Sequence, residues 1–328
     1  MKKYIDTGKK DTRSGFGAGL LIAGKENPNV VALTADLKGS LKMDAFAAEF
    51  PDRFIQCGIA EANMVGAAAG LAITGKVPFV GSFAEFVTGR VYDQIRQEVA
   101  YGKTNVKIAS SHAGITLGED GATHQTMEDI ALMRALPGMV VLNPCDYNQT
   151  VQATIAAARY NGPVYLRFGR PSVPNFTDPD QPFEIGKAIV MNEGKDVTLI
   201  VTGHTVWEAL QAAEALEADG ISAEVLDIAT IKPLDEKAIL ASLAKTGCAV
   251  VAEEHNHAGG LGEAVAGVLA RELPKPLVFV NGEDKFGQSG TPSALMAAYG
   301  LDAKHIAEAA KKAIAKSKWK TRRKSLTK

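Results

Sequence analysis

The sequence has few cysteines, almost no net charge and no long apolar run. Its three cysteines, Cys57, Cys145 and Cys248, are far apart, so they predict neither a disulfide framework nor a CxxC metal site. A formal net charge of -1 gives no electrostatic attraction to nucleic acid. No stretch reaches the roughly 18 apolar residues that a membrane span needs, and the charged N-terminus predicts neither a signal peptide nor an anchor. A cytoplasmic enzyme that acts on small molecules is the expected class.

Length and composition allow two globular domains. The chain has 328 residues, of which 46% are hydrophobic and 22% charged, and a domain commonly holds about 150 residues. Short runs rich in β-branched residues alternate with alanine-rich segments whose apolar residues recur at helical spacing. This alternation predicts an α/β protein of two domains, each a mostly parallel sheet flanked by helices.

The expected elements fall into two groups. In the first group, buried strands are predicted at 30–36, 76–83, 106–113, 139–144 and 163–168, with helices at 62–75, 87–101, 126–138 and 148–161. In the second group, strands are predicted at 196–203, 222–235, 248–255 and 276–282, with helices at 207–220 and 260–274. The proline-rich segment 171–186 between the groups predicts a boundary. We expect domains at 1–175 and 191–316, a linker at 176–190 and a basic tail at 317–328.

The C-terminal segment KKAIAKSKWKTRRKSLTK is strongly basic, with nine Lys or Arg among its eighteen residues. We expect a frayed, solvated end. The alternative is a tail that binds a polyanion or docks onto a partner.

The segment GEDGATHQTMED, residues 118–129, concentrates polar groups in the first predicted domain. Its oxygen ligands do not follow the spacing of a calcium loop. A zinc site would need a second ligand, and His112 is the only nearby candidate for pairing with His124. Taken alone, the segment is typical of a polar turn before a helix.

The neighbouring segments change this interpretation. GIAEANMVGAAAGLA (58–72) and GSFAEF (81–86) precede it, and RALPGMVVLNPCD (134–146) and EDKFGQSG (283–290) follow it. In this order they resemble the C-terminal portion of a transketolase, which comprises a pyrimidine-binding domain and a C-terminal domain. The resemblance covers the chain from Arg13 to about Ile314. It implies a thiamine diphosphate-dependent transfer of a two-carbon ketol unit between sugar phosphates, as in the pentose phosphate pathway.

The family's diphosphate-binding half has no counterpart in this sequence. A GDG motif followed downstream by an Asn holds the magnesium ion in thiamine diphosphate enzymes, and GEDG is not that motif. The resemblance therefore implies a transketolase N-terminal subunit as partner, which holds most of the Mg²⁺ and diphosphate contacts. We expect this chain to homodimerise within an α2β2 heterotetramer.

The resemblance assigns cofactor contacts to four residues. Glu61 would protonate the pyrimidine nitrogen, although a first-turn Glu can also simply stabilise the helix dipole. Phe86 would stack on the pyrimidine ring and Phe83 would support it, unless both are core residues. Asp36 either approaches the cofactor or forms an Asx turn.

Two departures from the family concern this pocket. Thr88 and Gly89 stand where relatives often carry a further aromatic residue, which leaves one pocket wall undefined. Ala60 and Ala62 flank Glu61 where relatives often have Arg and His. The proton transfer should survive the second departure.

Further residues match the family's substrate contacts. Asp120, His124 and His112 would contact sugar hydroxyls, and an imidazole that titrates near neutrality suits proton transfer there. With Glu61 they form the expected catalytic set. Phosphate binding is expected from Arg13, Ser40 and Arg170, with Arg167 as a rival to Arg170 because the spacing allows either.

The sequence also resembles other classes of enzyme in part. EEHNHAGGLGEAV (253–265) resembles deoxyxylulose phosphate synthase, and ketoacid dehydrogenase beta subunits share the domain order. DGATHQ together with DKFGQSG favours transketolase over both. Retention of the catalytic set argues against a paralogue without activity, and no GxGxxG motif opens a helix after a strand, which argues against an NAD-dependent dehydrogenase. The second domain carries no expected catalytic residue and is assigned to assembly.

Overall fold

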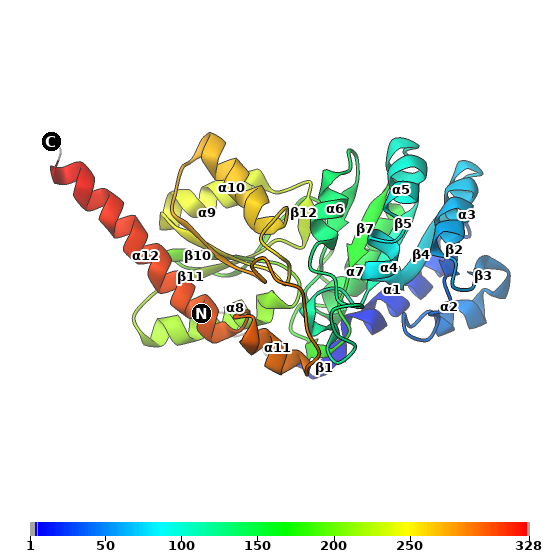
Figure 1. The fold of residues 1–328 in the computed structure, drawn as a ribbon, viewed down its shortest axis with the longest axis horizontal. Coiled ribbons are helices and arrows are strands. Elements are labelled where there is room, and N and C mark those ends of the chain that lie inside the picture. Colours follow the sequence, from blue (N-terminus) through cyan, green and yellow to red (C-terminus); the bar gives the residue numbers. More distant parts are fainter. Residues whose placement is uncertain (1–3, 5, 327–328) are drawn as a thin grey trace.

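The computed structural model describes residue 4 and residues 6–326, with side chains as far as residue 318. It consists of two layered α/β domains that lie side by side (Figure 1). Each domain has one mostly parallel sheet flanked by helices, as the alternation in the sequence predicts. Among the described residues, no helix combines the length and apolar character needed to cross a membrane.

The first sheet has seven strands in the order β12-β6-β7-β5-β4-β2-β3, and all neighbours except β12 run parallel. All five strands predicted for this domain are present. The bounds are β2 Val30–Thr34, β3 Phe54–Gln56, β4 Val77–Phe83, β5 Lys107–Ser111, β6 Val140–Leu142, β7 Val164–Arg167 and β12 Thr230–Lys232. Separately, β1 (Lys9–Asp11) pairs antiparallel with β8 (Ser172–Pro174).

Helices cover both faces of this sheet because successive strand residues point to opposite sides. Val31 and Leu33 of β2 join a core cluster with α3, whereas Val30 and Ala32 join the cluster formed with α1 and α7. The helices are α1 Thr12–Glu26, α2 Asp44–Glu49, α3 Glu61–Ile73, α4 Ala84–Thr88, α5 Tyr92–Gln94, the π-helix η2 Ile95–Tyr101, α6 Asp129–Ala135 and α7 Tyr147–Arg159. Short 3₁₀ turns occupy η1 Pro51–Arg53 and η3 Ile115–Leu117.

Two helical features differ from the sequence expectation. The glycine-rich segment of α1 was not predicted to be helical, because glycine disfavours helices. Its glycines permit close packing on α7: a Cβ on Gly19 would lie 2.7 Å from Thr154 Cβ. The single helix expected at 87–101 is instead divided into α4, α5 and η2, with a break after Thr88.

The second sheet has the order β14-β13-β10-β11-β9, with only β9 antiparallel. Its strands are β9 Ile189–Asn192, β10 Val197–Val201, β11 Ala223–Asp227, β13 Ala249–Ala252 and β14 Leu277–Val280. Its helices are α8 Thr205–Ala218, α9 Glu236–Thr246, α10 Leu261–Glu272, α11 Pro292–Ala298 and α12 Ala303–Leu326. The predicted strand 222–235 is in fact two strands, and the second, β12, crosses to pair with β6 of the first sheet.

Helix α12 extends away from the second domain at the C-terminal end of the chain (Figure 1). Its backbone is helical through Leu326, so this helix includes most of the predicted basic tail. Residues 327–328 of that tail lie outside the described part of the chain, as do the side chains after residue 318.

Candidate active site

The carboxyl edge of the first sheet collects most of the predicted site residues. In a parallel sheet, the loops that follow neighbouring strands lie next to one another at this edge. The order β7-β5-β4-β2-β3 therefore places five such loops in one row. Along this row lie Arg170, His112, Phe83, Asp36 and Glu61.

Glu61 is the first residue of α3, and its side chain is only 4% exposed. The positive end of the helix dipole stabilises a carboxylate at this position. Arg90 donates from Nη1 to Glu61 Oε1 at 2.9 Å, and its guanidinium carbon lies 4.3 Å from the centroid of the Phe86 ring. Sequence reasoning missed Arg90. Its signal is the spacing of four residues from Phe86, which places the two side chains within reach of each other across the end of α4.

Four rings form a continuous row beside this ion pair. Phe83 and Phe86 are stacked with centroids 5.8 Å apart, and Phe83 also stacks on His112 at 3.8 Å. His124 meets Phe86 edge to face at 5.4 Å. The aromatic residues that the sequence singled out, together with both histidines, therefore lie in one place.

His112 is held in a strained and buried position. Its φ of 59° lies in the left-handed region, which costs a non-glycine residue about 1–3 kcal/mol and is frequent at functional sites. Burial lowers the pKa of its imidazole to about 3, and Coulombic interactions with Arg13, Arg170 and His124 act in the same direction. Ser111 Oγ lies 2.5 Å from His112 Nδ1. The imidazole is therefore neutral near neutral pH, and its orientation is fixed by the contact with Ser111 and by stacking on Phe83.

Asp36 also has a left-handed backbone, with φ 60°, and its side chain is exposed at the end of β2. Its backbone N–H donates to Gln56 Oε1 at 2.8 Å. The strain fits a functional position as well as a turn, so both interpretations of Asp36 stand.

Two arginines flank His112. Arg13 donates from Nη1 to the carbonyl of Ser40 at 3.2 Å, so the predicted pair is adjacent. Burial lowers the pKa of Arg13, and the charge of Arg170 contributes to this shift. Arg170 donates to the carbonyl of Leu117 at 2.7 Å and pairs with Glu119 at 2.9 Å. Together they provide a cationic end to the row.

Arg167 does not belong to this cationic end. Its side chain is 4% exposed, and it donates from Nε to Asp129 Oδ2 at 2.7 Å and from Nη2 to the carbonyl of Glu254 at 2.8 Å. Tyr165 donates to the same carboxylate at 2.6 Å. A guanidinium committed to these buried acceptors is not available to a phosphate, so the structure argues against the phosphate-binding role predicted for Arg167.

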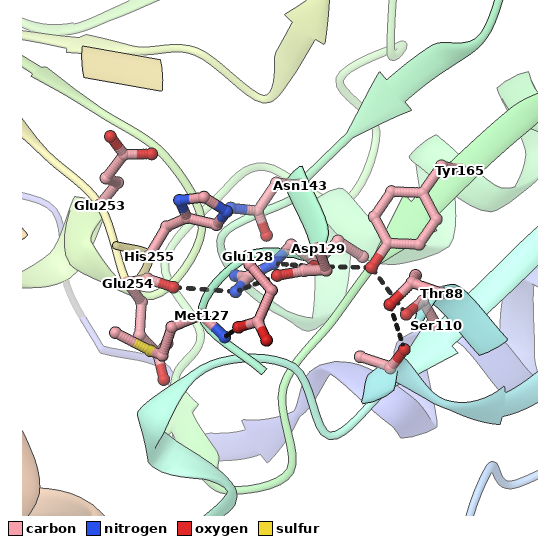
Figure 2. A network of polar contacts seen from close by, with 12 residues as sticks. Thr88, Ser110, Met127, Glu128, Asp129, Asn143, Tyr165, Glu253, Glu254 and His255 are labelled. Atoms are coloured by element: carbon pink, nitrogen blue, oxygen red, sulfur yellow. Dashed lines mark hydrogen bonds and ion pairs between the residues drawn. The ribbon is translucent and has the colours of Figure 1, made fainter. Parts of the chain in front are cut away.

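Buried polar contacts join the second domain to the site. Figure 2 shows Glu254 and His255 of the second domain beside Asp129 and Tyr165 of the first. Glu254 Oε1 accepts from the backbone N–H of Thr116 at 2.5 Å. A Cβ on Gly114 would lie 2.3 Å from Glu254, so only glycine allows this close approach.

The loop between His112 and α6 carries the remaining predicted residues. Asp120 is exposed and His124 is half-buried, with Thr123 Oγ1 3.0 Å from His124 Nδ1. Gln125 Nε2 donates to the carbonyl of Gln288 at 3.0 Å. The loop is thus attached to segment 283–290, and the second domain helps to shape the site, beyond the assembly role predicted for it.

The assembled groups have a definite chemical capacity. An aromatic wall next to a buried carboxylate suits a flat heteroaromatic ring. A neutral imidazole and two guanidinium groups beside it suit hydroxyls and an anion. No group of three or more His, Cys, Asp or Glu side chains that could hold a metal ion occurs in the part of the chain that the structure describes.

Comparison with known proteins agrees with this capacity. Residues 8–175 match the family model of the transketolase pyrimidine binding domain, and residues 186–306 match that of the transketolase C-terminal domain. A solved structure described as a split gene transketolase, an inactive beta4 tetramer, superposes with a TM-score of 0.87 at 46% identity. The match covers 94% of this chain and 100% of that one.

The relatives by sequence include proteins described as separate subunits as well as longer chains. A protein described as a transketolase C-terminal section from Methanocaldococcus jannaschii is 48% identical, over 91% of this chain and 95% of that protein. A 6-deoxy-6-sulfo-D-fructose transketolase subunit from Clostridium sp. is 44% identical, over 89% and 90%. Human transketolase is 39% identical over 97% of this chain, but only 51% of its own length is matched. The chain therefore belongs to the transketolase family and carries its pyrimidine-binding and C-terminal domains.

Proposed function

We propose that this chain is the C-terminal subunit of a thiamine diphosphate-dependent transketolase. It transfers a two-carbon ketol unit from a ketose phosphate to an aldose phosphate. The observation that carries the proposal is the convergence of the buried Glu61, the Phe83–Phe86 wall and the two histidines along one sheet edge. No other surface described above joins a buried carboxylate to an aromatic row and cationic groups.

The residues present fit the aminopyrimidine half of the cofactor. When bound, thiamine diphosphate supplies a thiazolium carbanion that accepts the ketol unit. Glu61 would hold a proton against the pyrimidine nitrogen by a charge-assisted hydrogen bond. Phe86 would stack on the ring and Phe83 would keep Phe86 in place, while Asp36 would lie at the rim of the pocket.

The rest of the row fits a sugar phosphate. His112 is neutral at working pH, and because Nδ1 is engaged by Ser111 Oγ, its Nε2 can donate to or accept from a hydroxyl according to the tautomer. His124 and Asp120, farther along the same loop, would contact further hydroxyls. Arg13 and Arg170 would bind the phosphate, with Ser40 supporting Arg13. The sulfofructose named for the Clostridium relative also carries an anionic group.

The proposal includes a transketolase N-terminal subunit as partner. That subunit would hold the diphosphate and most of the Mg²⁺ contacts, and two copies of each chain would form an α2β2 assembly. Support comes from relatives of similar length that are described as a C-terminal section or a subunit, and from the split gene relative, whose beta4 tetramer is described as inactive. The expected setting is the pentose phosphate pathway.

Reconstitution tests this function directly. The chain would be assayed alone and with a candidate N-terminal subunit, in the presence of thiamine diphosphate and Mg²⁺, for ketol transfer from xylulose 5-phosphate to ribose 5-phosphate. Activity only in the mixture supports the proposal. Activity with pyruvate and glyceraldehyde 3-phosphate, without ketol transfer, would contradict it in favour of a deoxyxylulose phosphate synthase-like reaction.

A further inference from the structure

Arg90 contacts both groups that the proposed function assigns to the pyrimidine ring. Its Nη1 donates to Glu61 Oε1 at 2.9 Å, and its guanidinium carbon lies 4.3 Å from the Phe86 ring centroid. A guanidinium is flat, carries several donors and stacks on aromatic faces. It can therefore make the same two kinds of contact that a flat, protonated heteroaromatic ring would make.

The Arg90 guanidinium and a bound pyrimidine ring cannot occupy this position at the same time. A ring stacked on Phe86 needs its centroid within about 4.5–7 Å of that side chain, and the guanidinium already lies on this face. The Glu61 side chain is 4% exposed, so its carboxylate has little room for a second partner, whereas the Arg90 side chain is 49% exposed. Of the two, Arg90 is the group that can move outward into solvent.

The surroundings of Arg90 allow this movement. It lies in the short connection between the end of α4 at Thr88 and the start of α5 at Tyr92, outside regular helix. Glu85 lies close enough for the Arg90 charge to oppose the rise that burial causes in the pKa of Glu85. An outward Arg90 thus has a second carboxylate nearby.

We propose that Arg90 is a latch that occupies the aminopyrimidine position in the cofactor-free subunit and leaves it when the cofactor binds. This latch rests on the proposed function, because it competes for the groups assigned there to the ring. A partly exposed ion pair and one cation–π contact together correspond to about a fivefold to thirtyfold preference for the closed state. Apparent cofactor affinity falls by that factor, since only the open fraction binds.

The latch can be tested on the assembled pair, which is this chain together with its N-terminal partner subunit. The pair is titrated calorimetrically with thiamine diphosphate at constant Mg²⁺. Arg90→Ala removes both contacts and should lower the apparent Kd by about fivefold to thirtyfold. Arg90→Gln keeps much of the side chain but loses the charge, and it should lower the Kd as well. Arg271→Ala is the matched control: Arg271 is also half-exposed and pairs with a first-turn glutamate, Glu236, at 3.2 Å. Its Kd should equal that of the wild type.

The outcomes separate the latch from the proposed function. Tighter binding by both Arg90 variants, with no change for Arg271→Ala, supports the latch. Equal or weaker binding by the Arg90 variants, while the wild-type pair binds normally, overturns the latch and leaves the function standing. Absence of cofactor binding by the wild-type pair and by every variant overturns both. If Arg90→Ala misfolds, as judged by thermal unfolding, the Arg90→Gln titration decides by the same criterion.

Discussion

Arg167 and Arg170 are near neighbours in the sequence, but their surroundings give them different roles. Arg167 is buried and bonded to Asp129, whereas the Arg170 side chain is 38% exposed and acts electrostatically on His112. Removing one partner of a buried ion pair leaves the other charge uncompensated, which is far more costly than losing an exposed pair. Stability should therefore depend on the first arginine and ligand binding on the second.

Substitution of each arginine by methionine should separate these roles. Arg167→Met is expected to lower the free energy of unfolding by about 3–5 kcal/mol, because Asp129 keeps a buried charge. Arg170→Met is expected to change it by less than about 1 kcal/mol but to raise KM for phosphorylated sugars in the assembled pair. Urea denaturation and steady-state kinetics measure the two effects. Equal destabilisation by both variants would contradict the assignment.

The neutral state of His112 predicts a pH dependence of stability. Its pKa falls from 6.5 to about 3 on folding. Below pH 6.5 the unfolded chain binds a proton that the folded chain does not, so the free energy of unfolding decreases as pH falls toward 3. His204, with a pKa lowered to about 4, acts in the same sense. Above pH 6.5, His112 is neutral in both the folded and the unfolded chain, and its titration no longer lowers the free energy of unfolding.

His112→Gln should make that decrease shallower, by up to about 1.4 kcal/mol per pH unit. Urea denaturation at several pH values between 6.5 and 4 measures the slope in the wild type and the variant. His305→Gln is a suitable control, because His305 is half-buried on α12 and pairs with Asp302 of the second domain. An unchanged slope in His112→Gln would mean that the imidazole is not held neutral by its surroundings.

At the scale of elements, the loop 112–128 depends on the second domain. Glu254 accepts a hydrogen bond from the backbone N–H of Thr116, and Gln125 donates one to the carbonyl of Gln288. Two residues of the second domain therefore hold the loop. Loss of a buried acceptor leaves the N–H group unpaired and costs about 1–3 kcal/mol. The expected consequence is a looser loop and poorer positioning of His112 and His124.

Glu254→Ala should therefore lower the free energy of unfolding by about 1–3 kcal/mol and reduce kcat/KM in the assembled pair. Glu254→Gln keeps an oxygen acceptor for Thr116 and should retain most of both properties. Chemical denaturation and kinetics on the two variants give the comparison. If the glutamine variant is as impaired as the alanine variant, the hydrogen bond to the loop is not the reason for the effect.

The contact between α1 and α7 gives a second prediction at this scale. Gly19→Ala would place a Cβ 2.7 Å from Thr154 Cβ and 2.8 Å from the carbonyl oxygen of Val151. Overpacking of this kind typically costs about 1–3 kcal/mol, which outweighs the better helix propensity of alanine, about 1 kcal/mol. Gly267→Ala in α10 meets only Arg271 at 3.6 Å and should be neutral or stabilising. Thermal unfolding distinguishes the two variants.

At the scale of the whole molecule, the predictable and unpredictable parts of the fold have different physical causes. The long buried strands of both sheets were predictable because burial on two faces demands continuous apolar runs, whereas the short edge strands β3 and β9 were not predicted. Helix α1 was not, since its glycines serve contacts with α7 rather than local propensity. The crossing of β12 to the first sheet depends on pairing with β6, which is distant in sequence.

The candidate site also has residues that the sequence predicts and residues that it does not. Resemblance to a family identified Glu61, Phe83, Phe86 and both histidines, and the strand order brings them together. Arg90 was not predicted, because its ion pair with Glu61 spans 29 residues of sequence. Arg167 could not be separated from Arg170 by spacing alone, since only burial distinguishes them.

The most direct measurement is the ketol-transfer rate of the assembled pair when this chain carries Glu61→Gln. Because the substitution removes the carboxyl group but keeps its size, cofactor binding should persist while kcat falls by about a hundredfold to ten-thousandfold. Glu236→Gln is the control, since Glu236 is also the first residue of a helix and pairs with an arginine. A Glu61→Gln pair with the wild-type rate would contradict the claim that this chain supplies the catalytic carboxyl group.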